Sequence, residues 1–212
     1  KIGTTKRGNG PAYRDKYDRN GFRAEDMPCL QEYLIDIYEE LYSKDGVEIL
    51  FEGAQGFGLD IDHGDYPYVT SSHCTTAAAL LNGVPPQAVR NVWGVAKIYE
   101  TYVGAKAFQP HDSVFDALQE IGEEFGATTG RKRQCNWTDL DTLMKAVRMN
   151  GVTDLVFNKM DVLREVGEWK FYNNGNIVQL ESEQEVKSWL TSYFSNSPTI
   201  SNVYFSGNKD RI

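Results

Sequence analysis

The stretch DLVFNKMD, residues 154–161, runs from an apolar segment into an abrupt polar end. Residues 155–157 are typical of a strand that is buried in a sheet, and Asn158, Lys159 and Asp161 follow them directly. Open α/β sheets bind their ligands at the carboxyl edge, where such polar residues would lie. A carboxylate at Asp161 can accept hydrogen bonds from the ring N–H and the exocyclic amine of guanine together, a pairing that adenine does not offer. The stretch therefore predicts an α/β sheet with a GTP site at its edge.

Around this stretch, segments with strand and helix patterns alternate along the chain. Helices are expected at 25–46, 77–83, 112–126, 138–151 and 182–194, strands at 47–51, 153–157 and 201–207, and a strand or pair of strands at 91–104. Thr138 is expected to be the N-cap of its helix, and Ser182 and Glu185 form a capping box. A hairpin is expected over 168–181 around Asn174-Gly175. The rhythm predicts one α/β domain over residues 1–212, with a largely parallel central sheet flanked by helices.

Composition narrows the classes of function. The 212 residues carry a net charge of -8, with a pI near 5.0, which argues against a general nucleic-acid or membrane-surface role. No apolar stretch approaches the length of a membrane span, and no signal peptide opens the chain. The three cysteines, Cys29, Cys74 and Cys135, form no zinc or disulfide pattern and favour the cytoplasm.

Two basic segments stand out against this acidity. Residues 128–134, TTGRKRQ, place three cations beside two hydroxyls and a glycine, which suits the recognition of a carboxylate or phosphate by arginine. A solvated basic loop or an RNA contact stays open as an alternative. The opening segment GTTKRGNGP, residues 3–11, also suits a phosphate, or is an ordinary surface turn. A Walker A motif is absent from the sequence, and the start on KIGTT without Met leads us to expect missing upstream sequence.

Histidine gives no independent site. His63 lies near Asp60 and Asp62, but alternation along an extended segment would place the imidazole on the opposite side from the two carboxylates, which argues against a metal site. His73 and His111 have no convincing nucleophile partner in the sequence. A Ser-His-Asp hydrolase is therefore not expected, and no metal ligands are predicted.

Five segments taken in order carry a resemblance. They are IGTTKRGNGPAYRDKYDRNGFR (2–23), LFEGAQGFGLDIDHGDYPYVTSS (50–72), GEEFGATTGRKR (122–133) with Trp137, NKMDVL (158–163) and FSGNKDR (205–211). Together they resemble the adenylosuccinate synthetase family over nearly the whole chain. The resemblance implies a P-loop-GTPase-like α/β fold in a homodimer, in a compact archaeal or phage-like form whose N-terminal part is absent.

The activity that the resemblance implies is the GTP-dependent ligation of L-aspartate to IMP, giving adenylosuccinate, GDP and phosphate. GTP first phosphorylates the 6-oxygen of the purine, and the aspartate amine then displaces that phosphate, with Mg2+ assisting. The catalytic Asp and His of the family, and the Mg2+ ligands, are expected upstream of this chain, so no catalytic residue is assigned here. The implied partners are GTP, IMP and aspartate, with no nucleic acid and no membrane.

The resemblance also implies site residues. Thr5, Gln55, Thr70 and Arg131 match contacts to the nucleotide monophosphate, and Arg19 matches the arginine that reaches the neighbouring subunit's nucleotide site. The family's contacts to aspartate correspond to Thr128, Thr129, Arg131 and Arg133. Its contacts to GTP correspond to Arg133, Lys159, Met160, Asp161, Ser206 and Gly207.

Three departures from the family pattern qualify these implications. The stretch between residues 27 and 47 is shorter than in typical bacterial members. Tyr102 stands where the family usually has Arg, and Gln109-Pro110 where Pro-Thr-Glu is usual. Because this region lies near the nucleotide sugar and phosphate, dGMP stays open as the acceptor, as in phage relatives that make the 2-amino-deoxyadenylosuccinate. The third departure, the absent upstream segment, leaves open a guanine-nucleotide-binding module without catalysis.

Overall fold

The computed structural model describes residues 6–126 and 130–208. The contacts divide the chain into two compact units, an N-terminal unit of residues 4–90 and a C-terminal unit that comprises residues 91–212 together with 1–3. Each unit is described by itself below. The expectation of one domain over residues 1–212 stays a prediction.

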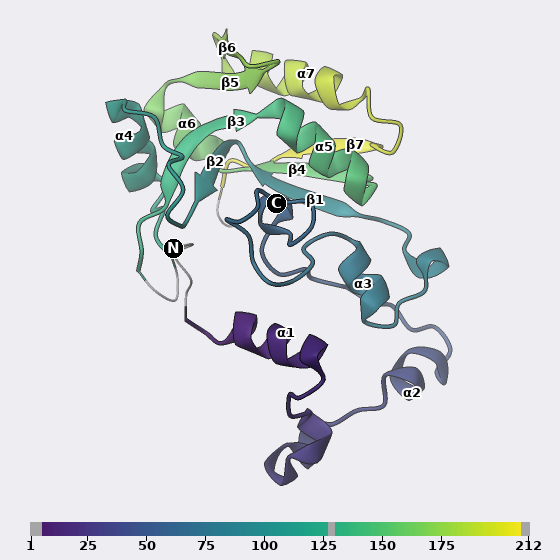
Figure 1. The fold of residues 1–212 in the computed structure, drawn as a ribbon. Helices are drawn as coiled ribbons and strands as arrows, with labels where there is room; N and C mark the ends of the chain where they lie inside the picture. The colour runs from purple at the N-terminus through teal and green to yellow at the C-terminus, as the bar shows by residue number, and fades with distance from the viewer. Residues whose placement is uncertain (1–5, 127–129, 209–212) are drawn as a thin grey trace. The chain divides into compact units, whose positions relative to one another are not determined.

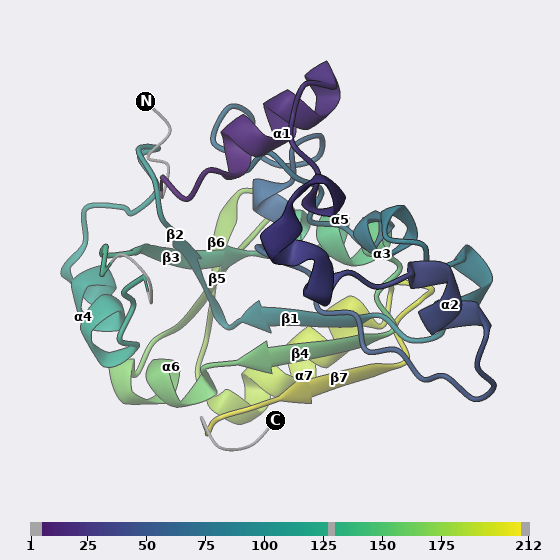
Figure 2. The same ribbon diagram turned by 90° about the horizontal axis from the view of Figure 1, so that it is seen from below.

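A three-stranded parallel sheet lies at the centre of the C-terminal unit. Its strands are β1 (Trp93–Lys97), β4 (Asp154–Asn158) and β7 (Asn202–Phe205), in the order β1-β4-β7. Figure 2 shows the three arrows pointing the same way, so their carboxyl ends lie at one edge. The predicted parallel α/β arrangement is confirmed here, and strand β4 is the stretch that predicted it.

A second sheet of four strands is mixed and was only partly predicted. It contains β2 (Tyr99–Tyr102), β3 (Gln134–Asp139), β5 (Trp169–Asn173) and β6 (Asn176–Leu180), in that order. Strand β3 pairs antiparallel with β2 and parallel with β5, although the sequence analysis predicted no strand over these residues. The predicted hairpin is confirmed, because β5 and β6 pair antiparallel around Asn174 and Gly175, which have φ of 50° and 72°.

Four helices accompany these sheets. They are α4 (Ser113–Ile121), α5 (Leu140–Asn150), α6 (Met160–Val166) and α7 (Glu183–Phe194). The side chain of Ser182 caps α7 by accepting from the N–H of Glu185, as predicted. The N-cap of α5 is Asp139 and not Thr138, which was the expectation. Thr138 is still in strand β3, where its hydroxyl donates to the carbonyl of Ile98.

The core of the C-terminal unit forms where helices pack on the sheets. Phe157 of β4 is fully buried, with its ring 5.6 Å from the rings of both Phe194 and Phe205. Leu140 and Phe171 are also fully buried in the same cluster. Burial of one such side chain stabilises the fold by about 1.5–3 kcal/mol. The carboxyl ends of the strands are therefore fixed by a packed interior.

The N-terminal unit consists of short helical segments and irregular chain. Its elements are α1 (Asn9–Asp18), η1 (Ala24–Asp26), η2 (Pro28–Tyr33), α2 (Ile37–Tyr42), η3 (Phe57–Leu59), α3 (Ala77–Leu81) and η4 (Pro86–Ala88). Helix α3 agrees with a predicted helix. Figure 1 shows α2 and shorter helical segments in place of one helix over 25–46. The prediction of one continuous helix is wrong, although α2 lies within its range, and the strand predicted at 47–51 has no strand structure.

The reason lies in burial. Among the described residues up to 90, only Asp60 and Ala79 are buried, so the apolar side chains at helical spacing have no core to pack against. Leu34 ends η2 in an extended conformation, with φ of -76° and ψ of 140°. Periodicity alone does not hold a helix together without such a surface. No helix in the described part of the chain is both long and apolar enough to cross a membrane.

Candidate functional site

Polar residues meet where the three parallel strands end. Asn158 is the last residue of β4 and is in register with Lys97, the last residue of β1. Ser206 follows β7, and its N–H donates to the carbonyl of Phe157 over 2.8 Å. The carbonyl of Ser206 accepts from the N–H of Met160 over 3.1 Å. Two segments that the sequence assigned to GTP, 159–161 and 206–207, are thus joined by backbone hydrogen bonds.

Lys159 and Asp161 begin helix α6. Lys159 has a left-handed backbone, with φ of 65°, and its ammonium donates to the carbonyl of Gly122 over 2.9 Å. Asp161 lies in the first turn of α6, and within the described residues its carboxylate has no hydrogen-bond or ion-pair partner. The side-chain oxygen of Asn158 is buried and likewise has none there. Two acceptor groups without donors therefore lie at the end of one strand.

Gly207 allows the chain to pass close to α6. A Cβ on Gly207 would lie 2.9 Å from Nη2 of Arg164 and 3.5 Å from the Cβ of Met160. Ser206 is buried beside it, with 8% of its surface exposed. A larger residue at 207 would push the loop away from the helix that carries Asp161. The position of the glycine is therefore explained by packing.

The basic segment returns on itself as a narrow hairpin. Phe125 and Lys132 form an antiparallel bridge, and the N–H of Gly126 donates to the carbonyl of Arg131 over 2.8 Å. The N–H of Arg133 donates to the carbonyl of Glu124 over 2.9 Å. Thr128 and Thr129, both predicted to contact aspartate, lie outside the described residues. Arg131 and Arg133 are on the returning segment, which leads into β3, and are partly exposed.

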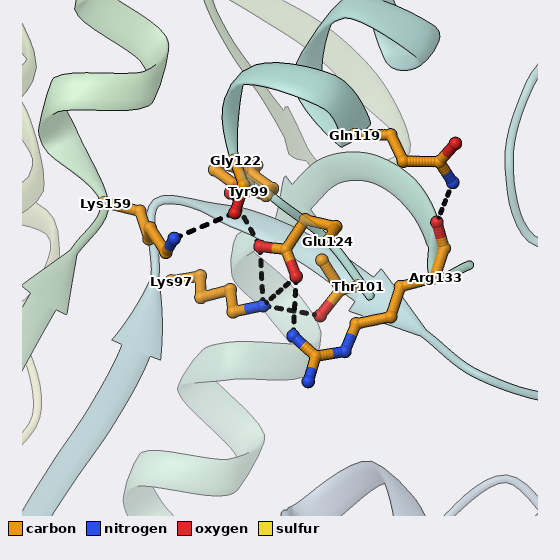
Figure 3. A network of polar contacts seen from close by, with 8 residues as sticks. All are labelled: Lys97, Tyr99, Thr101, Gln119, Gly122, Glu124, Arg133 and Lys159. Atoms are coloured by element: carbon orange, nitrogen blue, oxygen red, sulfur yellow. Dashed lines mark hydrogen bonds and ion pairs between the residues drawn. The ribbon is translucent and has the colours of Figure 1, made fainter. Parts of the chain in front are cut away.

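The first limb of this hairpin carries a carboxylate that the sequence did not single out. Glu124 is fully buried, and its two oxygens accept from the ammonium of Lys97, each over 2.7 Å. The hydroxyl of Tyr99 and Nη1 of Arg133 donate to the same carboxylate, also over 2.7 Å. Figure 3 shows these groups converging, with Thr101 accepting from Lys97.

The charges of this cluster are set by burial and by the hydrogen bonds. Burial acts to raise the pKa of Glu124, but donation from Lys97, Tyr99 and Arg133 outweighs it, and the pKa lies below its ordinary value. Burial lowers the pKa of Lys97, and the nearby charges of Arg133 and Lys159 act in the same direction. The pKa of Tyr99 is raised, first by burial and then by Glu124, so its hydroxyl stays a donor. Glu124 is therefore an ionised group at neutral pH.

The departures from the family pattern are built into the fold. The side chain of Gln134 accepts from the N–H groups of Phe108 and Gln109, over 2.9 and 3.2 Å. The side-chain oxygen of Gln109 accepts from the N–H of Cys135 over 2.9 Å. The ring of Tyr102 lies 5.8 Å from that of Phe108. Gln109 therefore fastens its loop to β3.

The N-terminal unit carries the residues that the sequence assigned to the nucleotide monophosphate. Arg19 ends α1 with φ of 62°, and Gln55 has φ of 63°; both side chains are exposed. The N–H of Thr70 donates to the carbonyl of Leu59 over 2.8 Å. Thr5 lies outside the described residues. Arg19, Gln55 and Thr70 are held by local backbone structure and not by a core.

Asp60 organises the loop that follows Gln55. Its carboxylate accepts from the N–H groups of Asp62 and His63, over 2.9 and 3.0 Å, and from that of Cys74 over 2.6 Å. Burial acts to raise the pKa of Asp60, but these three donors hold it below its ordinary value. The segment is a turn and not the extended chain assumed from the sequence.

The same loop contains a possible cluster of metal ligands. His73 lies with its Nδ1 3.5 Å from the carboxylate of Asp62, and ligand atoms of Asp60, Asp62 and His73 all lie within 4.8 Å of one another. His63, the histidine weighed from the sequence, is not a member of this group. Because the carboxylate of Asp60 already accepts from three N–H groups, the cluster primarily stabilises this turn.

Comparison with known proteins gives related sequences. A model of the adenylosuccinate synthetase family matches residues 28–179. Adenylosuccinate synthetase of Syntrophomonas wolfei is 41% identical over 77% of this chain and 50% of its own length. That of Nitratidesulfovibrio vulgaris (strain DP4) is 36% identical over 93% of this chain and 59% of its own length. The chain thus spans about half the length of the curated relatives that it matches.

Solved structures agree with the sequence matches. Fully ligated adenylosuccinate synthetase from Plasmodium falciparum is similar with a TM-score of 0.68 and 30% identity, over 84% of this chain and 54% of that one. Cyanophage S-2L succinoaminodeoxyadenylate synthetase, bound to dGMP and to dATP as an energy donor, shares the fold with a TM-score of 0.60 and 20% identity, over 90% of this chain and 65% of that one. With the family match over residues 28–179, the chain belongs to the adenylosuccinate synthetase family.

Proposed function

We propose that the protein containing this chain joins L-aspartate to the 6-position of IMP at the expense of GTP. The proposal is supported by membership of the family and by the polar edge of the parallel sheet. In this chain, the C-terminal unit supplies the guanine and aspartate contacts, and the N-terminal unit supplies contacts to the acceptor nucleotide. The family match and the unpatterned cysteines favour the cytoplasm as its location.

One observation carries the nucleotide assignment. Asp161 and the side-chain oxygen of Asn158 are acceptors without donors among the described residues, at the carboxyl end of β4. Buried polar groups in native proteins are normally paired, so the unpaired buried oxygen of Asn158 calls for a donor from a ligand, and the partly exposed carboxylate of Asp161 is accessible to one. Guanine presents its ring N–H and exocyclic amine as two adjacent donors. Adenine would leave the carboxylate of Asp161 unpaired, at a cost of about 1–3 kcal/mol or more.

The remaining residues have roles that follow from their chemistry. Arg131 and Arg133 would bind the carboxylates of aspartate through bidentate hydrogen bonds, with Thr128 and Thr129 adding hydroxyl donors. Ser206 and Gly207 would cover one face of the base. Thr5, Gln55 and Thr70 would hold the acceptor's phosphate and ring. The exposed Arg19 would reach the nucleotide site of a second subunit, which makes the homodimer part of the active site.

Mg2+ is implied by the family, but the described residues of this chain do not supply a fitting site. Mg2+ prefers near-octahedral oxygen ligands. The cluster of Asp60, Asp62 and His73 offers one imidazole, and the carboxylate of Asp60 is engaged by three N–H groups. We therefore derive no step through Mg2+ from these residues.

A second acceptor, dGMP, remains as an alternative within the same chemistry. It stays open because Tyr102, whose ring lies 5.8 Å from that of Phe108, stands where the family usually has Arg. IMP and dGMP carry the same 5'-phosphate, so this residue does not decide between them. A module that binds guanine nucleotides without catalysis is the alternative from another class.

The test is to incubate the full-length protein that contains this chain with Mg2+, GTP and aspartate, adding IMP or dGMP in parallel. Mass spectrometry then measures the succinylated nucleotide. Product from IMP supports the proposal, and product from dGMP alone assigns the second acceptor. Nucleotide binding with no product from either acceptor would leave only the binding module.

A further inference from the structure

We propose that Glu124 is the positioning residue for Arg133, holding that guanidinium ready for the carboxylate of the amino-acid substrate. The ligand named here rests on the proposed function, whereas the positioning rests on the structure alone. Glu124 would not touch the substrate itself. It would act through the arginine that does.

The first support is convergence on one buried group. Lys97 at the end of β1, Tyr99 on β2 and Arg133 on the returning segment of the hairpin all donate to the carboxylate of Glu124. The carboxylate side chain is 1% exposed, whereas that of Arg133 is 31% exposed. One end of the ion pair is therefore anchored in the fold, and the other reaches the surface.

The second support is the geometry left to Arg133. A guanidinium carries five N–H donors, and Glu124 accepts from Nη1 over 2.7 Å. The described residues offer the guanidinium no other partner. The remaining donors are free to form a bidentate pair with a carboxylate, as a planar guanidinium does. A fixed guanidinium binds with a smaller loss of side-chain entropy than a mobile one.

The third support is the balance of charge. Lys97 and Arg133 both pair with the single carboxylate of Glu124. Two cations therefore share one anion. Partly buried charge of one sign is costly unless it is compensated, so the cluster favours an anionic ligand. The substrate carboxylate would supply the missing negative charge.

The backbone around Glu124 connects the cluster to the guanine site. Arg133 is fixed twice more, since its N–H donates to the carbonyl of Glu124 and its own carbonyl accepts from the side chain of Gln119. Two residues before Glu124, the carbonyl of Gly122 accepts from Lys159. A substitution at Glu124 that disturbs this turn should therefore also weaken GTP binding, through Lys159, but less than it affects Arg133.

The kinetic test uses the full-length protein that contains this chain and three variants. Glu124→Gln removes the charge at constant size, Glu124→Asp keeps the charge on a shorter side chain, and Glu123→Gln makes the same charge change at the exposed neighbour. We expect Glu124→Gln to raise KM for aspartate about 10-fold or more, with a smaller effect on kcat. Glu124→Asp should restore part of this loss, and Glu123→Gln should stay within about twofold of the wild type.

A second readout needs no turnover. Phenylglyoxal modifies accessible arginines, and peptide mapping by mass spectrometry gives a separate rate for each one. Glu124→Gln should raise the rate at Arg133 several-fold while leaving unchanged the rate at Arg164, which pairs with Glu183. An unchanged rate at Arg133, or an equal response to Glu123→Gln, would overturn the proposal.

The two readouts separate the two ideas. A wild-type protein that makes no succinylated product, combined with the expected change at Arg133, would sink the proposed function and leave the positioning intact. Product formation by the wild type, combined with an unchanged KM for aspartate and an unchanged rate at Arg133 in Glu124→Gln, would support the proposed function and overturn the positioning role of Glu124.

Discussion

The two units of this chain hold their candidate site residues by different means. In the C-terminal unit a cluster that includes Phe157, Phe171 and Leu140 is buried completely, and the polar edge grows out of that packed interior. Among the described residues up to 90, Asp60 and Ala79 are the buried ones. The residues proposed to contact guanine and aspartate are thus positioned by tertiary packing, and those proposed to contact the acceptor nucleotide by local hydrogen bonds.

The two units also differ in how they bury large apolar side chains. In the N-terminal unit, Phe22 is 93% exposed and Leu50 is 94% exposed, although both side chains are large and apolar. In the C-terminal unit the large aromatic side chains of the sheet face each other instead. Substitutions of large apolar side chains should therefore have large effects in the C-terminal unit and small ones in the N-terminal unit.

The largest expected effect comes from Phe157→Ala, compared with Phe22→Ala. The first removes a fully buried ring that packs on Phe194 and Phe205, and should lower the free energy of unfolding by about 3–5 kcal/mol. The second should change it by less than about 0.5 kcal/mol, since the ring is exposed. Urea denaturation followed by tryptophan fluorescence measures both. Equal losses would break the comparison, because Phe22 would then be buried in the protein.

The next effect sharpens the account of the N-terminal unit. Asp60→Asn replaces one carboxylate oxygen by a donor facing backbone N–H groups, and should cost about 1–3 kcal/mol of local stability. Amide hydrogen exchange should become faster at Asp62, His63 and Cys74. Asp45→Asn, at an exposed position, is the matched control and should leave these rates unchanged.

The same site has a predicted pH dependence. The hydrogen bonds hold the pKa of Asp60 below 3.8, so its stabilisation is present at neutral pH and is lost as the pH falls through this lowered value. Protection that persists in strong acid would contradict the role of the carboxylate.

A third prediction concerns Glu100 in the C-terminal unit. Burial and the charge of Asp139 raise the pKa of Glu100 to about 7, against the opposing effects of the Asp139 N–H and of Lys106. The folded state therefore holds a proton that the unfolded state releases near pH 4.5, and stability should fall as the pH rises from about 4.5 to about 7. Glu100→Gln should remove this slope and stabilise the protein above pH 7 by about 1–2 kcal/mol. An unchanged slope in pH-dependent denaturation would refute it.

The smallest effect is expected at the surface of the same unit. Glu183 pairs with Arg164 and Lys187, and donation from Arg164 lowers the pKa of Glu183 to about 2. Because the side chain of Arg164 is 53% exposed, Glu183→Gln should cost only about 0–1 kcal/mol at pH 7. The difference from the wild type should vanish as the pH falls from about 4.5 to about 2. A loss as large as that of Phe157→Ala would show that surface pairs rival the core.

The sequence predicted features whose causes are local. The buried run 155–157, the capping serine of α7 and the Asn-Gly turn each depend on neighbouring residues, and each is present in the structure. The predicted helix over 25–46 depended on a surface to cover its apolar face, which periodicity cannot supply. Strand β3 was missed because its partners, β2 and β5, lie far away in the sequence.

In the candidate site, too, the residues with local signals were predicted and those that depend on distant contacts were missed. Lys159 and Asp161 were predicted because they follow a strand directly. Glu124 was missed because its significance comes from Lys97, 27 residues away, and from burial. One of two adjacent glutamates is buried and the other exposed, and the sequence gives no sign of which. The residue pattern thus identifies the groups proposed to contact a ligand better than the groups that hold them in place.

The central claim is that β4 ends on residues that read guanine, and a change of base preference tests it most directly. Affinities of GTP and XTP should be measured for the full-length protein that contains this chain, for Asp161→Asn, and for Glu165→Gln on the same helix as the control. Xanthine carries a carbonyl where guanine carries its amine, so the amide of an asparagine can donate to it. The wild type and the control should prefer GTP, and Asp161→Asn should prefer XTP, by about 10-fold or more in each case. Equal loss of both nucleotides, or an unchanged preference in Asp161→Asn, would contradict the account.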